Sequence, residues 1–117
     1  MTQHELGNTG QQQAEAYLRQ KGYQLRHLNY RVQTGEIDIV AQDGEYIVFV
    51  EVKARRGLQN GYPREAVGYG KQRKIRKTAL FYINQYNLPD TQDYRFDVVE
   101  VLYLGDDCTI THIENAF

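Results

Sequence analysis

The sequence lacks the features that mark disulfide-stabilised and zinc-binding proteins. Cys108 is the only cysteine in 117 residues, so an intrachain disulfide and a cysteine-based zinc site are both excluded. We expect Cys108 to be a small strand residue in a reducing compartment. The three histidines, His4, His27 and His112, are far apart and lack metal-ligand spacing. They are therefore predicted to lie on the surface or to be buried with their hydrogen bonds satisfied.

Long apolar runs are also absent. No run approaches the roughly 18 residues that a membrane-spanning helix needs. The N-terminus has neither the basic start nor the hydrophobic run of a signal peptide. We therefore predict a cytoplasmic protein with no membrane partner. A length of 117 residues is enough for one hydrophobic core but not for two, which predicts a single domain over residues 1–117.

The charges are unevenly distributed along the chain, although the net charge is only −1. Nine of the fourteen Lys and Arg residues lie between Lys53 and Lys77, where Glu65 is the single acid, and the balance reverses from Asp90 onward. Such a basic segment fits a phosphate backbone, although charge runs often form only the solvated face of a helix. We predict that the partner is a nucleic acid, with DNA expected, and that the contacting residues are Arg55, Arg56, Lys71, Arg73, Lys74 and Lys77.

Two acidic residues, Asp38 and Glu51, stand among β-branched and aromatic residues in segments that are typical of strands. A carboxylate inside a buried strand costs several kcal/mol unless a cation, a metal or hydrogen bonds compensate it. The Asp43-Gly44 pair between the two segments predicts a β-hairpin. Pairing centred on that turn places Asp38 opposite Phe49, and a slip of two residues sets Asp38 opposite Glu51.

In both registers Asp38, Glu51 and Lys53 share one face of the hairpin. The opposite face is predicted to be a continuous apolar surface that packs on a helix, formed by Ile37, Ile39, Ala41, Val48, Val50 and Val52. Because two neighbouring carboxylates repel, we predict that Asp38 and Glu51 bind Mg²⁺ or Mn²⁺ and that Lys53 assists the attacking water. Metal-dependent phosphodiester hydrolysis is the implied reaction. The alternative is an internal ion-pair cluster of the three residues.

The remaining patterns predict an α/β fold with the order αβββαββ. The spacing of apolar residues and the positions of Gly and Asp indicate helices over residues 11–21 and from 65 or 71 to 86, and strands over 23–32, 37–41, 46–53, 95–104 and 108–113. The glycine-rich segment 57–70 is either an irregular connection or a loop that closes over nucleic acid. In it, Tyr62 and Tyr69 are suited to stacking on bases. Three other tyrosines, Tyr17, Tyr82 and Tyr86, are expected to pack in the core.

The chain resembles a known family in several motifs. The run Gly35–Asp38 followed by Phe49–Lys53 resembles the D…ExK core of the restriction-endonuclease-like superfamily, which includes Holliday-junction resolvases. The full-length pattern, with Lys21–Tyr23, Arg95–Val99 and the closing Ile113–Phe117, resembles the bacterial YraN family. This resemblance implies a mixed central sheet flanked by helices and a nuclease activity on DNA, including branched or otherwise structured DNA.

One position departs from the pattern that the resemblance implies. A Glu in the first helix often completes the metal site in this superfamily, and the corresponding residue here is Gln11. An amide oxygen brings no charge to offset a cation. We therefore expect Gln11 only as an outer contact of the site. The other expected outer contacts are Glu15, Glu36 and Gln72.

Three functions remain open on the sequence. The first is a metal-dependent endonuclease; the second is a nucleic-acid-binding module that keeps the fold without cutting, which Gln11 would help to explain. The third is an interaction protein that binds a partner or forms a homodimer. Asp97 could be taken for a further metal ligand, but Arg95 lies two residues away on the same strand face, which favours an ion pair.

Overall fold

The computed structural model describes residues 2–57 and 67–117 of the chain. Two helices and five strands follow one another in the predicted order αβββαββ. They are α1 (Gln3–Gln20), β1 (Gln24–Val32), β2 (Gly35–Asp43), β3 (Tyr46–Arg56), α2 (Tyr69–Gln85), β4 (Asp93–Leu104) and β5 (Asp107–Ile113).

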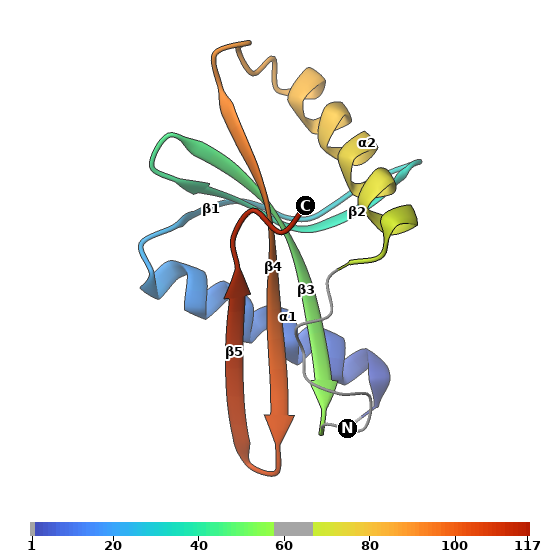
Figure 1. The fold of residues 1–117 in the computed structure, drawn as a ribbon, viewed down its shortest axis with the longest axis vertical. Coiled ribbons are helices and arrows are strands. Elements are labelled where there is room, and N and C mark those ends of the chain that lie inside the picture. Colours follow the sequence, from blue (N-terminus) through green and yellow to red (C-terminus); the bar gives the residue numbers. More distant parts are fainter. Residues whose placement is uncertain (1, 58–66) are drawn as a thin grey trace.

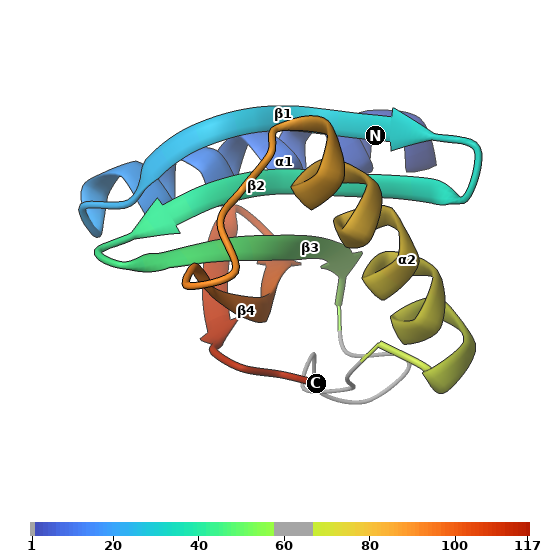
Figure 2. The ribbon, with the colours of Figure 1, turned by 90° about the horizontal axis from the view of Figure 1, so that it is seen from above.

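The five strands form one mixed sheet in the order β1-β2-β3-β4-β5. Strands β3 and β4 are parallel, and each of the other neighbouring pairs is antiparallel. Parallel neighbours need a long crossover, and α2 supplies it. Figures 1 and 2 show α1 and α2 on opposite faces of the sheet. The predicted mixed sheet flanked by helices is confirmed.

Each helix covers its own hydrophobic core. Phe49 packs with Ile75 and Tyr82 on the α2 side, whereas Val48 packs with Ala14 and Leu18 on the α1 side. Because successive strand residues point to opposite faces, the central strands are apolar at nearly every position. The predicted packing of Tyr82 is confirmed, since its side chain is buried on the α2 side.

The face predicted for Ile37 is wrong. Ile37 packs on the α2 side, whereas Ile39 packs on the α1 side as predicted. The alternation breaks at Asp38, and β1 is irregular at the same level, because Asn29, between the partners of Ile37 and Ile39, has a left-handed φ of 53°. A residue in this conformation locally interrupts the pleat that a simple alternation assumes.

Three further details correct the sequence analysis. Helix α1 begins at Gln3 instead of Gln11, because the Thr2 hydroxyl caps it by accepting a hydrogen bond from the Glu5 N–H at 3.1 Å. Tyr69 is the first residue of α2, not part of a loop, and Tyr86 is 42% exposed, not buried in the core. Tyr62, Glu65 and most of the predicted glycine-rich loop lie outside the described residues.

Helix α1 approaches β3 most closely at Gly10. A Cβ at this position would lie 2.5 Å from the Ala54 Cβ, so α1 would have to move away from the sheet. We expect Gly10→Ala to lower the free energy of unfolding, measured by urea denaturation, by about 1–3 kcal/mol. Gly7→Ala is the matched control in the same helix. It has no neighbour within 4 Å and should raise stability by up to about 1 kcal/mol. Equal stabilities of the two variants would contradict the close packing.

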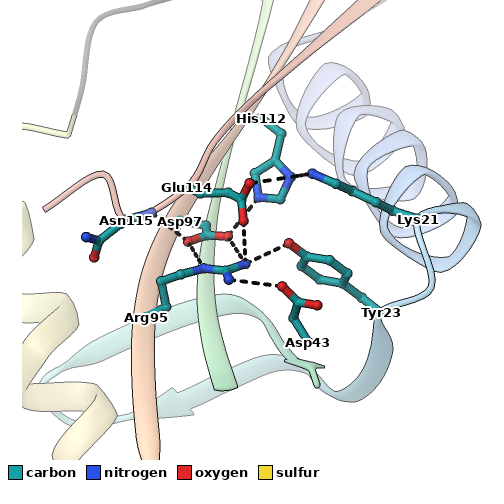
Figure 3. Close-up of polar contacts among 8 residues, drawn as sticks. All are labelled: Lys21, Tyr23, Asp43, Arg95, Asp97, His112, Glu114 and Asn115. Carbon is teal, nitrogen blue, oxygen red and sulfur yellow. Dashed lines mark hydrogen bonds and ion pairs between the residues drawn. The ribbon is translucent and has the colours of Figure 1, made fainter. Parts of the chain in front are cut away.

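A polar cluster centred on Arg95 lies beside the C-terminal end of α1 (Figure 3). The guanidinium donates to both carboxylate oxygens of Asp97 at 2.9 Å and to Asp43 at 3.0 Å. It also donates to the Tyr23 hydroxyl at 2.6 Å. Burial alone would raise the pKa of Asp97, but the hydrogen bonds from His112 and Arg95 outweigh it and hold the pKa below its usual value. The predicted Arg95–Asp97 ion pair is confirmed.

His112 belongs to the same cluster and has both ring nitrogens satisfied, as predicted for a buried histidine. Its Nε2 lies 2.7 Å from Asp97, and its Nδ1 lies 2.9 Å from the Lys21 ammonium group. A carboxylate only accepts and an ammonium only donates, so these contacts require a neutral imidazole with its proton on Nε2. The Asn115 N–H also donates to Asp97, at 2.9 Å, which ties the C-terminal segment to β4.

Candidate functional site

The hairpin of β2 and β3 brings Asp38 and Glu51 together. The strands pair from Asp43 opposite Tyr46 to Ile39 opposite Val50, so Asp38 and Glu51 are the next residues of each strand beyond the last pair. This is the slipped register of the two that the sequence allowed. The Val52 N–H donates to Asp38 Oδ2 at 2.8 Å, which fixes the carboxylate at the level of Glu51.

Both carboxylates line one cleft, which we call the carboxylate cleft and which also receives side chains from the first turns of α2. Its polar lining includes Glu36, Asp38, Glu51, Lys71 and Lys74. The Lys71 ammonium group lies 2.7 Å from Glu51 Oε1, and the Glu51 side chain is only 7% exposed. The cleft has a volume of about 570 Å³, so at roughly 30 Å³ per water it has room for a hydrated ion and a phosphate group.

The electrostatics of this cleft are those of two acids held close together. Burial, and next the charge of Glu51, raise the pKa of Asp38 from 3.8 to about 7, against the opposing effect of the Val52 N–H. The hydrogen bond to Glu51 raises the pKa of Lys71, so the ammonium form is favoured there. The site therefore has a surplus of negative charge that a cation relieves.

Lys53 lies in a neighbouring cleft, which we call the lysine cleft. Glu51 and Lys71 line this cleft as well, so the two clefts meet at these side chains. Arg55 and Glu100 complete its charged lining, and Glu100, which pairs with Lys53 in the β3–β4 register, is only 1% exposed. Lys53 lies two residues after Glu51 in β3, and both residues line this cleft.

Gln11 reaches the site from the other helix. A third cleft is lined by Gln11 of α1 together with Glu36 and Asp38 of β2. The helix position at which the resemblance implies a metal-binding Glu therefore lines a cleft that Asp38 also lines. Glu36 lines both this cleft and the carboxylate cleft, and it accepts a hydrogen bond from Arg31 at 3.0 Å.

The other predicted outer contacts lie elsewhere. Glu15 forms an ion pair with Arg19 of its own helix at 4.0 Å. Gln72 donates to the Val67 carbonyl at 2.7 Å and so holds the chain that leads into α2. Neither residue is among those that line the three clefts in the described part of the chain.

The predicted nucleic-acid contacts divide into two groups. Arg55, Lys71 and Lys74 line the clefts just described. Arg73 and Lys77 are exposed on α2, and the Arg73 guanidinium lies 5.9 Å from the centre of the Tyr69 ring. Arg56 lies at the end of β3 in a separate hollow with Tyr103. The basic residues therefore extend from the clefts along α2 and along the end of β3.

Two residues at the site were missed by the sequence analysis. Lys71 was predicted only as a nucleic-acid contact, and nothing local links it to Glu51, since the two lie 20 positions apart and on different elements. Glu100 was not singled out, although its setting between Val99 and Val101 is the same buried-charge signal that identified Glu51. A search for every acidic residue between two β-branched residues would have identified Glu100 as well as Glu51.

The donor set at the carboxylate cleft fits a hard divalent cation. Mg²⁺ is held in proteins by one or two carboxylates, with waters and phosphate oxygens as the other ligands, and Asp38 and Glu51 provide two carboxylates in one cleft. An ammonium group already lies against Glu51, which shows that the position accepts a cation. Within residues 2–57 and 67–117, no group of three or more His, Cys, Asp or Glu residues is placed to hold a metal ion, so the remaining ligands would be waters and phosphate oxygens.

No helix in the described part of the chain is long and apolar enough to cross a membrane.

Comparison with known proteins gives a consistent result. The sequence model of a family described as "Uncharacterised protein family UPF0102" matches residues 10–101. A UPF0102 protein of Syntrophus aciditrophicus is 48% identical and covers 100% of this chain and 92% of its own length. UPF0102 proteins of Caldicellulosiruptor saccharolyticus and Thermodesulfovibrio yellowstonii are 43% and 44% identical over 100% of this chain and 100% and 99% of their own lengths.

Proposed function

The chain belongs to the uncharacterised protein family UPF0102, the YraN family, and on its fold and site we propose that it is a divalent-metal-dependent endonuclease that hydrolyses phosphodiester bonds in DNA. Branched or otherwise structured DNA is the substrate that the resemblance to junction resolvases favours.

One observation carries this proposal. Asp38 and Glu51, from opposite strands of a hairpin, line one cleft, and Lys53 follows Glu51 by two residues in the cleft beside it. Two acids and a lysine in this order, next to an open cleft, are what hydrolysis of a phosphodiester needs: ligands for a cation and a group that stabilises developing negative charge.

Each residue has a role in this proposal. Asp38 and Glu51 would hold Mg²⁺ or Mn²⁺, which when bound would activate a water molecule and polarise the scissile phosphate. Lys53 would orient the attacking water or stabilise the charge on the phosphate through its ammonium group. The Val52 N–H orients Asp38 by its hydrogen bond at 2.8 Å, so the backbone of β3 positions this ligand.

The surroundings of the clefts support a nucleic-acid partner. Lys74, Arg73 and Lys77 lie in successive turns of α2, which begins at the carboxylate cleft. Arg55 lines the lysine cleft on the other side of Glu51. A backbone that passed over both clefts would meet positive charge on either side of the cleaved bond, so its affinity should fall steeply as salt rises.

The test is cleavage of labelled single-stranded, duplex, flap and four-way-junction DNA with Mg²⁺, Mn²⁺ or EDTA. We expect the wild type to cut only with metal, and Lys53→Ala to cut about a hundredfold more slowly, because removing one group that stabilises transition-state charge has an effect of that order. Arg19→Ala, at an exposed position near the end of α1 that lines none of the three clefts, is the control for loss of one positive charge and should cut at the wild-type rate. Cutting that survives in EDTA, or that is as fast in Lys53→Ala as in the wild type, would contradict the proposed site.

A second candidate function is a nucleic-acid-binding module without catalysis. The specific observation in its favour is Gln11, because an amide lines the cleft with Asp38 at the position where the resemblance implies a carboxylate. If folded wild-type protein binds DNA in a salt-dependent manner but cuts none of the four substrates, this function replaces the nuclease. The Gln11→Glu variant, tested in the same panel, then shows whether the amide is the cause.

A further inference from the structure

We propose that Lys71 is the built-in counter-ion of the site: in the metal-free protein its ammonium group takes the place of the divalent cation at Glu51, and metal binding displaces it toward the phosphate of the substrate. This inference rests on the proposed function, because it assigns Lys71 a role at the same metal site.

The first support is the contact itself. The Lys71 Nζ lies 2.7 Å from Glu51 Oε1, the distance of a charge-assisted hydrogen bond. Glu51 is 7% exposed, so its carboxylate is largely removed from water and depends on neighbouring groups for compensation. A cation bound to the same oxygen has to replace this ammonium group.

The second support is the balance of charge in the carboxylate cleft. Three carboxylates line it, from Glu36, Asp38 and Glu51, against the two ammonium groups of Lys71 and Lys74. Glu36 is held by Arg31 outside the cleft at 3.0 Å, which leaves Asp38 and Glu51 as the pair that repel one another. The Lys71 ammonium group contacts Glu51 at 2.7 Å and so reduces that repulsion.

The third support is that Lys71 has freedom to leave. Its side chain is 57% exposed, whereas that of Glu51 is 7% exposed, so the contact joins an exposed side chain to a buried one. Lys71 is the third residue of α2, and the residue before it is Gly70. A lysine has four rotatable methylene groups, so its ammonium can move several ångströms without any change in the helix.

Lys71 also lies where a displaced ammonium group could contact a phosphate of the substrate. It lines both the carboxylate cleft and the lysine cleft, and Glu51 is the acid between them. Lys74 lines the carboxylate cleft one helical turn further on. Once a divalent cation holds Glu51, the freed ammonium remains next to any phosphate in either cleft, so Lys71 is a positioning residue for the substrate and a competitor of the metal.

Competition predicts that removing Lys71 strengthens metal binding. The test is calorimetric titration of the folded protein with Mn²⁺, without DNA, at about pH 8, well above the usual pKa of a carboxyl group. We expect Lys71→Met to bind Mn²⁺ about tenfold more tightly than the wild type, because the metal no longer displaces a charge-assisted hydrogen bond. Methionine keeps most of the length of the side chain and removes the charge.

Lys74→Met is the matched control. It removes the same charge from the same cleft, and within the described residues Lys74 makes no ion pair with Glu51. Both variants lose long-range repulsion of the metal, but only Lys71→Met loses the competitor. The order of affinity should therefore be wild type, then Lys74→Met, then Lys71→Met. Thermal unfolding curves of the three proteins verify that each is folded.

The inference is overturned if Lys71→Met binds Mn²⁺ no more tightly than Lys74→Met, or if none of the three folded proteins binds Mn²⁺ at all. These outcomes can be separated from failure of the nuclease. A wild type that cuts DNA while Lys71→Met shows no gain in affinity removes only the role of Lys71. Conversely, tighter Mn²⁺ binding by Lys71→Met in a protein that cuts no DNA keeps the counter-ion and removes the nuclease.

Discussion

Asp38→Asn is expected to reduce metal-dependent DNA cleavage by roughly a thousandfold, because the proposed metal site would lose one of its two carboxylates. The same variant should unfold less readily than the wild type, with a free energy of unfolding at about pH 8 that is higher by roughly 2 kcal/mol. Asparagine keeps the oxygen that accepts from the Val52 N–H at 2.8 Å, so the change removes charge and little else.

The gain in stability follows from the pKa of Asp38. Burial and the charge of Glu51 raise it from 3.8 in the unfolded chain to about 7 in the folded protein. The folded protein therefore binds this proton more tightly than the unfolded chain does. Its contribution to stability is complete below about pH 4 and is lost as the pH rises through about 7. Above that pH the folded state holds two ionised carboxylates side by side, which Asp38→Asn relieves.

The measurement is urea denaturation of wild type and Asp38→Asn at several values between about pH 4 and about pH 8. The difference in stability should be near zero at the acidic end and should grow toward the alkaline end. Asp93→Asn, at an exposed position at the start of β4, serves as the control and should stay within about 0.5 kcal/mol of the wild type. A loss of stability in Asp38→Asn at the alkaline end would show that Asp38 is a structural ion-pair partner.

Asp97→Ala is expected to lower the free energy of unfolding by about 3–5 kcal/mol, the range found when one partner of a buried ion pair is removed. Asp97 is fully buried, and Arg95, with 11% of its side chain exposed, would lose both hydrogen bonds at 2.9 Å. His112 and the Asn115 N–H would lose their acceptor as well. Because domains of this size are stable by only about 5–15 kcal/mol, the variant should lose a large part of its stability, as measured by urea denaturation.

The matched control for this prediction is Glu36→Ala. Glu36 also pairs with an arginine at 3.0 Å, but its side chain is 36% exposed and that of Arg31 is 72% exposed. Such pairs contribute about 0–1 kcal/mol, so the loss in urea denaturation should be several times smaller than that of Asp97→Ala. Similar losses in the two variants would show that burial does not decide the strength of these pairs. Because the pKa of Asp97 is lowered in the folded protein, its ionised carboxylate stabilises the fold above about pH 4, and this stabilisation is lost at lower pH.

The sequence by itself determined the order of elements, the family and the candidate acids. Periods of two and of three to four residues identify strands and helices locally, and Asp38 and Glu51 were visible because each interrupts such an apolar strand. The Arg95–Asp97 ion pair was also predicted correctly, because residues two apart in a strand share a face.

Only the tertiary structure decided which of two hairpin registers is adopted, and therefore that Asp38 and Glu51 directly follow the last pair, Ile39 and Val50, on their strands. It also decided the face of Ile37, the contact of Lys71 with Glu51, and the position of Gln11 in a cleft that Asp38 also lines. Local periodicity specifies what each segment is, but these contacts depend on how α1 and the α2 crossover pack on the sheet. That packing is set by the shape of both cores together, for example by the absence of a side chain at Gly10 where α1 meets β3.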